Sequence, residues 1–169
     1  MKLKFALATN SDATEIAALH NAVAEDLTRR FGRGRWSSTQ SERGVLNNLR
    51  KPRFSRILTA REEGKILATL RLATKKPWAI DTAYFTAVER PLYLTGMAVD
   101  PDHQRKGIGR CLLKEAESLA REWPADAIRL DAFDADAGAG GFYRGSGYRQ
   151  VARVSYKGDP LIYFELLLC

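Results

Sequence analysis

The sequence lacks the features of membrane proteins and of disulfide-rich secreted proteins. Its 169 residues include two cysteines, Cys111 and Cys169, which form neither a disulfide framework nor a ligand cluster. No apolar run approaches the roughly 18 residues that a membrane span needs. Polar residues at positions 10–12 interrupt the apolar stretch at the N-terminus, so the core of a signal peptide is missing. We therefore expect a cytoplasmic protein with reduced thiols and no membrane contact.

Repeats, linkers and low-complexity segments are also missing. The hydrophobic fraction of 45% and the charged fraction of 28% are typical of a soluble globular protein. A chain of 169 residues is long enough to bury a core of its own. The sequence therefore predicts a single domain over residues 1–169.

The formal net charge of +7 does not by itself indicate nucleic acid as a partner. The basic residues are dispersed, with higher density only at 29–35 and 50–56. A nucleic-acid-binding protein would interleave aromatic and basic residues on a strand face or carry a recognition helix, and neither pattern is evident. A positive field equally suits a highly anionic small ligand.

Hydrophobic periodicity predicts an α+β protein. Apolar segments between turn residues are interpreted as strands at 5–8, 54–61, 65–73, 92–99, 128–133, 148–154 and 161–167. Helical spacing and turn residues predict helices at 12–30, 41–49, 109–122 and 137–144. Residues 74–91 contain aromatic side chains between prolines and are interpreted as a strand extension plus a loop. His20 shares a helix face with core residues, which favours a partly buried structural role over a catalytic one.

The most informative stretch is a strand, a basic turn with two glycines, and an amphipathic helix, at 96–113. Glycines let the backbone turn tightly and approach a ligand, and the helix N-terminus directs free N–H groups into that turn. This arrangement favours phosphate binding. A dinucleotide fingerprint is excluded because Leu112 stands three residues after Gly109, and a P-loop is excluded because Lys106 precedes its glycine.

Two motifs in this region resemble those of the GNAT (Gcn5-related N-acetyltransferase) superfamily. The sequence Gln104-Arg105-Lys106-Gly107-Ile108-Gly109 resembles the acyl-CoA pyrophosphate loop Q/R-x-x-G-x-G. Downstream, Asp136-Ala137-Gly138-Ala139-Gly140-Gly141-Phe142-Tyr143-Arg144-Gly145-Ser146-Gly147-Tyr148 resembles N-x-x-A-x-x-F-Y-x-x-x-G-F/Y. The resemblance covers residues 92–150 firmly. It implies one mixed, mostly antiparallel sheet of about seven strands flanked by helices, with splayed central strands.

The resemblance implies acetyl-CoA as the acyl donor. The backbone of Met97 and Val99 would pair with the pantetheine arm, and the N–H near Met97 or Ala98 would polarise the thioester carbonyl. The remaining residues of the predicted cofactor site are Gln104, Arg105, Lys106, Gly107, Ile108, Gly109, Arg110, Asp136 and Ala139. Asp136 replaces the usual asparagine of the family, and a carboxylate accepts but cannot donate a hydrogen bond.

Tyr143 occupies the position of the family's general acid. A phenol with a pKa near 10 is protonated at neutral pH and can pass its proton to the departing thiolate. The strand at 92–99 contains no acidic residue, so the general base is left open between Asp131, Glu89, Asp81 and a chain of waters. Cys111 lies on the first turn of the motif helix, away from the predicted thioester, which argues against an acyl-enzyme.

The acceptor pocket is predicted from side chains that no core pattern claims. We expect Trp36, Trp78 and Tyr84 to line it, with at least one of Asp81, Glu89 and Asp131 near the amine. Aromatic faces and carboxylates together suit a cationic, partly apolar substrate. The alternative is that Trp78 and Tyr84 pack inside a strand extension.

These observations predict an N-acetyltransferase that moves the acetyl group of acetyl-CoA to a primary amine in a ternary complex. The alternatives are a non-catalytic acyl-CoA-binding sensor, which would not need Tyr143, and a basic nucleic-acid-binding protein. The expected partners are acetyl-CoA and an amine acceptor, with no metal, no nucleic acid and no membrane. A homodimer is allowed.

Overall fold

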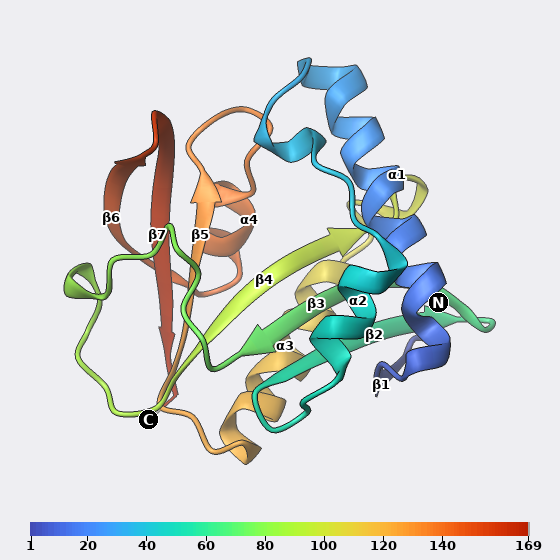
Figure 1. The fold of residues 1–169 in the computed structure, drawn as a ribbon, viewed down its shortest axis with the longest axis horizontal. Helices are drawn as coiled ribbons and strands as arrows, with labels where there is room; N and C mark the ends of the chain where they lie inside the picture. The colour runs from blue at the N-terminus through green and yellow to red at the C-terminus, as the bar shows by residue number, and fades with distance from the viewer. Residues whose placement is uncertain (169) are drawn as a thin grey trace. The chain divides into compact units, whose positions relative to one another are not determined.

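The computed structural model of the chain describes residues 1–168 (Figure 1). Its strands and helices are β1 (Lys4–Leu7), α1 (Ala13–Phe31), α2 (Glu42–Leu49), β2 (Ser55–Glu62), β3 (Lys65–Ala73), β4 (Pro91–Val99), α3 (Ile108–Glu122), β5 (Ala127–Phe133), α4 (Gly140–Gly145), β6 (Arg149–Tyr156) and β7 (Asp159–Leu167). Short 3-10 turns intervene as η1 (Asn10–Asp12), η2 (Arg35–Ser37), η3 (Thr82–Tyr84) and η4 (Pro101–His103). The predicted strands and helices are confirmed, with ends displaced by no more than three residues.

The strand extension predicted within residues 74–91 is wrong. The segment is a loop that contains η3, whose first turn is capped by the Asp81 carboxylate accepting from the Ala83 N–H at 3.0 Å. The aromatic side chains that favoured extended structure serve a different purpose here. Phe85 is buried and its ring stacks on Tyr163 at a centroid distance of 5.2 Å. Tertiary packing of a few anchors therefore overrides β-propensity in this segment.

The strands form one mixed sheet in the order β1-β2-β3-β4-β5-β7-β6. The β1–β2, β5–β7 and β6–β7 pairs are antiparallel, and β4 runs parallel to β5. The β4–β5 register extends from Pro91↔Ala127 to Tyr93↔Arg129, three residue pairs of a nine-residue strand. The predicted mixed, mostly antiparallel sheet with splayed central strands is thereby confirmed.

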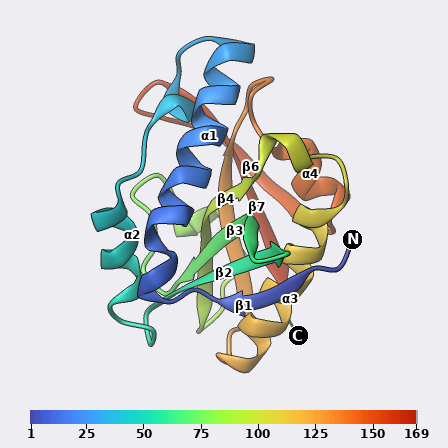
Figure 2. The ribbon, with the colours of Figure 1, turned by 90° about the vertical axis from the view of Figure 1, so that its right-hand side faces the viewer.

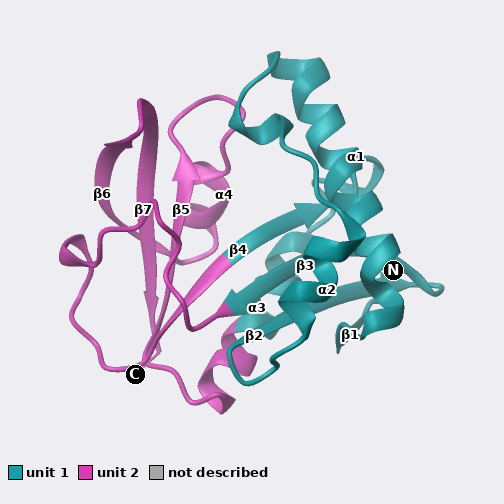
Figure 3. Cartoon of the chain, viewed as in Figure 1, with its two compact units in different colours: residues 1–72, 95–116 teal, residues 73–94, 117–169 magenta. Residues whose placement is uncertain are grey.

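The chain divides into two compact units, which Figure 3 shows in separate colours. Unit 1 comprises residues 1–72 and 95–116, and unit 2 comprises residues 73–94 and 117–169. Strand β4 and helix α3 each contribute residues to both units. The single domain over 1–169 stays a prediction.

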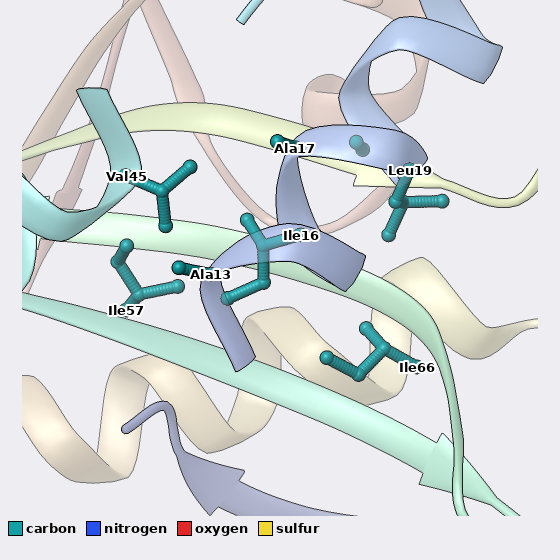
Figure 4. Packing of buried hydrophobic residues seen from close by; sticks show 8 residues of the cluster. Ala13, Ile16, Ala17, Leu19, Val45, Ile57 and Ile66 are labelled. Atoms are coloured by element: carbon teal, nitrogen blue, oxygen red, sulfur yellow. The ribbon is translucent and has the colours of Figure 1, made fainter. Parts of the chain in front are cut away.

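The core of unit 1 is made by helices packed on strands (Figure 4). Helix α1 supplies Ala13, Ile16 and Ala17 at the i, i+3, i+4 spacing of one helix face. These side chains meet Val45 of α2 and apolar residues of β2, β3 and β4. Helix α2 begins where the Ser41 hydroxyl accepts from the Gly44 N–H at 3.0 Å. Figure 2 shows α1 and α2 on one face of β2 and β3, with the first half of α3 on the other.

In unit 2, successive residues of β7 face opposite sides of the sheet, as strand geometry requires. Tyr163 packs with Ile80, Phe85 and Tyr93, so the 74–90 loop covers one face. Phe164 contacts the ring of Tyr143, so α4 covers the other. The loop is further held where the Glu165 carboxylate accepts from the backbone N–H and the hydroxyl of Thr86, at 3.1 and 2.6 Å.

None of the helices among residues 1–168 combines the length and the apolar character that a membrane crossing requires.

Candidate active site

The corner that follows β4 is fixed by Asp100. Its backbone N–H donates to the Leu67 carbonyl at 2.8 Å. Its carboxylate accepts from the Asp102 N–H at 2.9 Å and from Lys65 Nζ at 3.0 Å. Burial opposes the charged form, but these hydrogen bonds and one from His103 hold the pKa of Asp100 below its ordinary value. The start of the loop after β4 is therefore held at a defined position.

The predicted pyrophosphate loop has the backbone geometry of a ligand cradle. The Gln104 side chain donates to the Val99 carbonyl at 3.1 Å and so braces the end of β4. Arg105 has φ +61°, a left-handed conformation that is costly for a residue with a Cβ. Gly107 has φ +83° and open space where a Cβ would point. Arg105, Lys106 and Gly107 are exposed.

Helix α3 begins at Ile108, directly after this turn. Its first hydrogen bond runs from the Cys111 N–H to the Gly107 carbonyl at 3.1 Å. The backbone N–H groups of Ile108, Gly109 and Arg110 precede that bond and have no acceptor within the helix. The Arg110 side chain is exposed beside them. Free N–H groups, the positive end of the helix dipole and basic side chains can together hold a diphosphate.

The second half of β4 connects this loop to a cavity in unit 1. Ala98 is buried in the core, and Met97 and Val99 are half-buried. Gly96 is exposed and has φ +62°, and a Cβ there would lie 3.4 Å from His20 Cε1. The cavity has a volume of about 210 Å³, and Thr95, Gly96 and His20 all line it. The positive φ of Gly96 departs from regular strand geometry at the point where β4 borders the cavity.

Tyr143 lies in unit 2 on α4, with 5% of its surface exposed. Its ring packs edge-on against Tyr148 at 5.7 Å and tilted against Phe164 at 5.9 Å. Burial raises the pKa of Tyr143 well above the ordinary value, and the nearby Asp131 carboxylate adds to the shift. The phenol is thus firmly protonated at neutral pH and able to donate. The neighbouring Phe142 is half-buried, and its ring lies 5.2 Å from that of Tyr143.

The three candidate bases differ in their surroundings. Burial raises the pKa of Asp131 on β5, which brings the carboxyl toward the range of a working base. Asp81 is occupied as the cap of η3, and Glu89 is exposed on the loop before β4. Of the three, Asp131 is the carboxyl whose charge raises the pKa of Tyr143.

The predicted acceptor-site aromatics belong to different units. Trp36 of unit 1 donates from Nε1 to the Gly32 carbonyl at 2.8 Å. Trp78 of unit 2 is 83% exposed, so core packing of this side chain is excluded. Tyr84 is 51% exposed and meets Tyr163 edge-on at 5.8 Å. Asp136 and Ala139 are exposed in unit 2, and Ala139 is the N-cap residue of α4.

Sequence reasoning missed Arg71, a cation that lines the cavity beside Gly96. It lies on β3 between Leu70 and Leu72, both fully buried. A charged residue inside such an apolar run was the available signal, because a strand rarely places an arginine there without a partner.

Comparisons with known proteins agree on one family. The model of the acetyltransferase (GNAT) family matches residues 17–148. A chloroplastic GCN5-related N-acetyltransferase 10 of Arabidopsis thaliana is 37% identical over 78 residues, which are 46% of this chain and 28% of that protein. The chain thus aligns with less than a third of this relative's length.

Solved structures share the fold at low sequence identity. PaiA N-acetyltransferase of Thermoplasma acidophilum, in complex with coenzyme A, has a TM-score of 0.75 at 14% identity, covering 96% of this chain and 98% of its own. YncA of Salmonella typhimurium, with its cofactor acetyl-CoA, has a TM-score of 0.73 at 18% identity, covering 99% and 94%.

Proposed function

We propose that this chain, which belongs to the acetyltransferase (GNAT) family, transfers the acetyl group of acetyl-CoA directly to a primary amine. The observation that carries the proposal is the loop Gln104–Arg110, where a left-handed turn and a bare helix N-terminus follow β4 in the order that anion binding requires. The solved relatives that contain coenzyme A or acetyl-CoA support the choice of ligand.

In the proposed reaction the acceptor nitrogen attacks the thioester carbonyl carbon and the carbon–sulfur bond breaks. A backbone N–H at Met97 or Ala98 stabilises the developing oxyanion, an interaction worth about 3 kcal/mol in comparable sites. Asp131 takes the proton that the amine loses, and Tyr143 donates a proton to the thiolate. Burial raises the pKa of Asp131 toward the operating pH, which suits a base. Burial also keeps the Tyr143 phenol protonated, so its proton is present when the thiolate forms.

Two alternatives weigh less. A non-catalytic acyl-CoA sensor would have no use for a protonated phenol beside a carboxyl of raised pKa, and this chain has that pair. A nucleic-acid-binding protein would need a recognition surface that the sequence does not show. We further propose that the protein works in the cytoplasm without a metal.

Two measurements test the proposed function. Acetyl-CoA should raise the melting temperature of the protein, whereas NAD and ATP should not, because stabilisation follows preferential binding to the native state. Release of coenzyme A should then be followed across a panel of small amines, polyamines and peptides. Absence of any acetyl-CoA shift would refute the proposal, and a shift without turnover on any amine would favour the sensor.

A further inference from the structure

The cavity in unit 1 has an unusual set of polar side chains. Residues of helices α1 and α2, of strands β2, β3 and β4, and of the segment before α2 line its volume of about 210 Å³, which is partly open to solvent. This volume is large enough for several water molecules or for the acidic end of a small metabolite. Its polar lining consists of His20, Gln40, Asn48, Thr69, Arg71 and Thr95. Among these residues of unit 1 there is no aspartate or glutamate.

Arg71 is held in the wall by hydroxyl groups. Its Nε donates to Thr95 Oγ1 at 3.1 Å, and its Nη1 donates to Ser55 Oγ at 3.2 Å. A guanidinium has five N–H donors in a planar fork, so these two contacts fix its orientation and leave other donors to meet a ligand. Burial lowers the pKa of Arg71, and no neighbouring carboxylate opposes the shift. The half-buried charge therefore has room for an anion as its counter-charge.

The other titratable group in the lining does not supply that counter-charge. Burial lowers the pKa of His20, so its imidazole is neutral at physiological pH. Gln40 and Asn48 are uncharged amides, half-buried at the cavity wall. The lining thus carries one positive charge and several neutral hydrogen-bonding groups. Such a site attracts a small anion and does not favour a polyamine.

The cavity adjoins the strand on which the acyl donor is proposed to bind. Thr95 and Gly96 line it, and Met97 is the next residue of β4. One strand residue advances the chain by about 3.3 Å, so a small molecule in the cavity lies within reach of the Met97 backbone. An occupant of the cavity that carries an amine is therefore close to the proposed site of acetyl transfer.

We propose that this cavity binds the acidic group of the acceptor, with the Arg71 guanidinium as its counter-ion, so that the substrate is a small amine that also carries a carboxylate or phosphate. The proposal rests on the acetyltransferase function proposed above and names the substrate class. An amino-acid-like acceptor carries a positive amine and a negative acidic group. Its amine therefore still suits the carboxylates and aromatic rings predicted for the acceptor site.

The direct test compares acceptors that differ only in the acidic group, with the unmodified protein and acetyl-CoA. Free amino acids are matched with their methyl esters, phosphoethanolamine with ethanolamine, and spermidine is the cationic reference. The kcat/KM of at least one acid should exceed that of its neutral partner by about 10- to 100-fold, the range for a charge-assisted hydrogen bond. The amino-acid and phosphoethanolamine arms distinguish a carboxylate from a phosphate.

Variants place the preference on Arg71. Arg71→Met should raise the KM of the acid by the same 10- to 100-fold and leave the KM values of the ester and of acetyl-CoA unchanged. Arg71→Lys should recover part of the affinity. Arg43→Gln, which removes an exposed charge on α2, is the matched control. It should leave the KM values of the acid, of the ester and of acetyl-CoA unchanged.

Each outcome decides the proposal. Esters or spermidine that match the acids would overturn it while leaving acetyl transfer, and with it the proposed function, intact. If no amine in the panel is acetylated, the proposal is tested by the change in melting temperature that the same acids cause in the presence of coenzyme A. Shifts that Arg71→Met abolishes would support the anion site, and no shift with any acid would overturn it.

Discussion

Two arginines, one buried and one half-buried, show how differently the two units accommodate a charge removed from solvent. Arg129 of unit 2 is 4% exposed and donates to the Tyr93 hydroxyl at 3.1 Å and the Thr86 carbonyl at 2.8 Å. Its guanidinium also lies over the Phe85 ring, 5.2 Å from the centroid. Arg71 of unit 1 is half-buried, contacts two hydroxyls and lines a cavity. The first charge is enclosed by its own fold, and the second faces a space that a ligand can fill.

The comparison extends to the rest of each unit. Unit 1 leaves backbone N–H groups at the start of α3 and a guanidinium at the cavity, all suited to anions. Unit 2 contains Asp131 and Tyr143, whose pKa values are both raised by burial. Unit 1 is therefore expected to govern binding, and unit 2 to govern proton transfer.

The largest expected effect is on acetyl-CoA affinity in Gly107→Val. A β-branched residue at φ +83° is strained and would distort the loop that directs N–H groups at the pyrophosphate. We expect at least a ~100-fold weaker Kd by calorimetry, equivalent to one or two charge-assisted hydrogen bonds. Gly158→Val, at φ +85° in the turn between β6 and β7, imposes the same strain and should leave the Kd unchanged. Equal losses in the two variants would place the cofactor elsewhere.

Tyr143→Phe should lower kcat by about 10²-fold with little change in the acetyl-CoA Kd, because it deletes only the donating hydroxyl. Tyr148→Phe is the matched control. The Tyr148 hydroxyl is buried without a hydrogen-bond partner among the described residues, so its loss should not slow turnover and should stabilise the fold. Full activity in Tyr143→Phe would make that phenol structural.

Asp131→Asn should lower kcat/KM by about 10-fold, below the usual contribution of a base because water can also accept the amine proton. It should also change stability with pH. Burial raises the folded-state pKa of Asp131 above the unfolded value, so the cost of its charge is absent below the unfolded pKa and complete above the folded one. The variant should therefore be more stable than the parent at neutral pH and equal to it near pH ~3. Denaturant titrations at both pH values check this, and lower stability at pH 7 would contradict it.

The smallest effect is expected at the acceptor-site aromatics. Trp36→Ala or Trp78→Ala should raise the acceptor's KM several-fold, by about the ~1 kcal/mol of a cation–π contact, and leave the acetyl-CoA KM unchanged. Changes in both KM values, or in neither, would remove these side chains from the acceptor site.

Local patterns predicted most of the fold because its helices have an apolar face and its strands are apolar runs that end at turn residues. The apolar face of α1 that carries Ile16 and the continuous apolar run of β7 can both be recognised in the sequence. The loop in segment 74–91 is as predicted, but the strand extension is not, because the form of the segment depends on distant anchors such as Phe85 stacking on Tyr163. No local pattern encodes that contact.

Part of the candidate site could also be predicted from local sequence, and part could not. The loop at 104–110 could be predicted because its glycines and helix start are contiguous in sequence. The cavity could not, since it gathers His20, Asn48, Arg71 and Thr95 from four separate elements. The raised pKa of Asp131 likewise depends on burial that only the folded chain provides.

Hydrogen–deuterium exchange with and without acetyl-CoA tests the central claim most directly, because it reports protection amide by amide. If unit 1 binds the acyl donor, slower exchange should be found over residues 97–99 and 107–110, where the backbone N–H groups are proposed to meet the cofactor. NAD and ATP should leave the same amides unchanged. Protection confined to unit 2, or none on addition of saturating acetyl-CoA, would contradict the assignment of binding to unit 1.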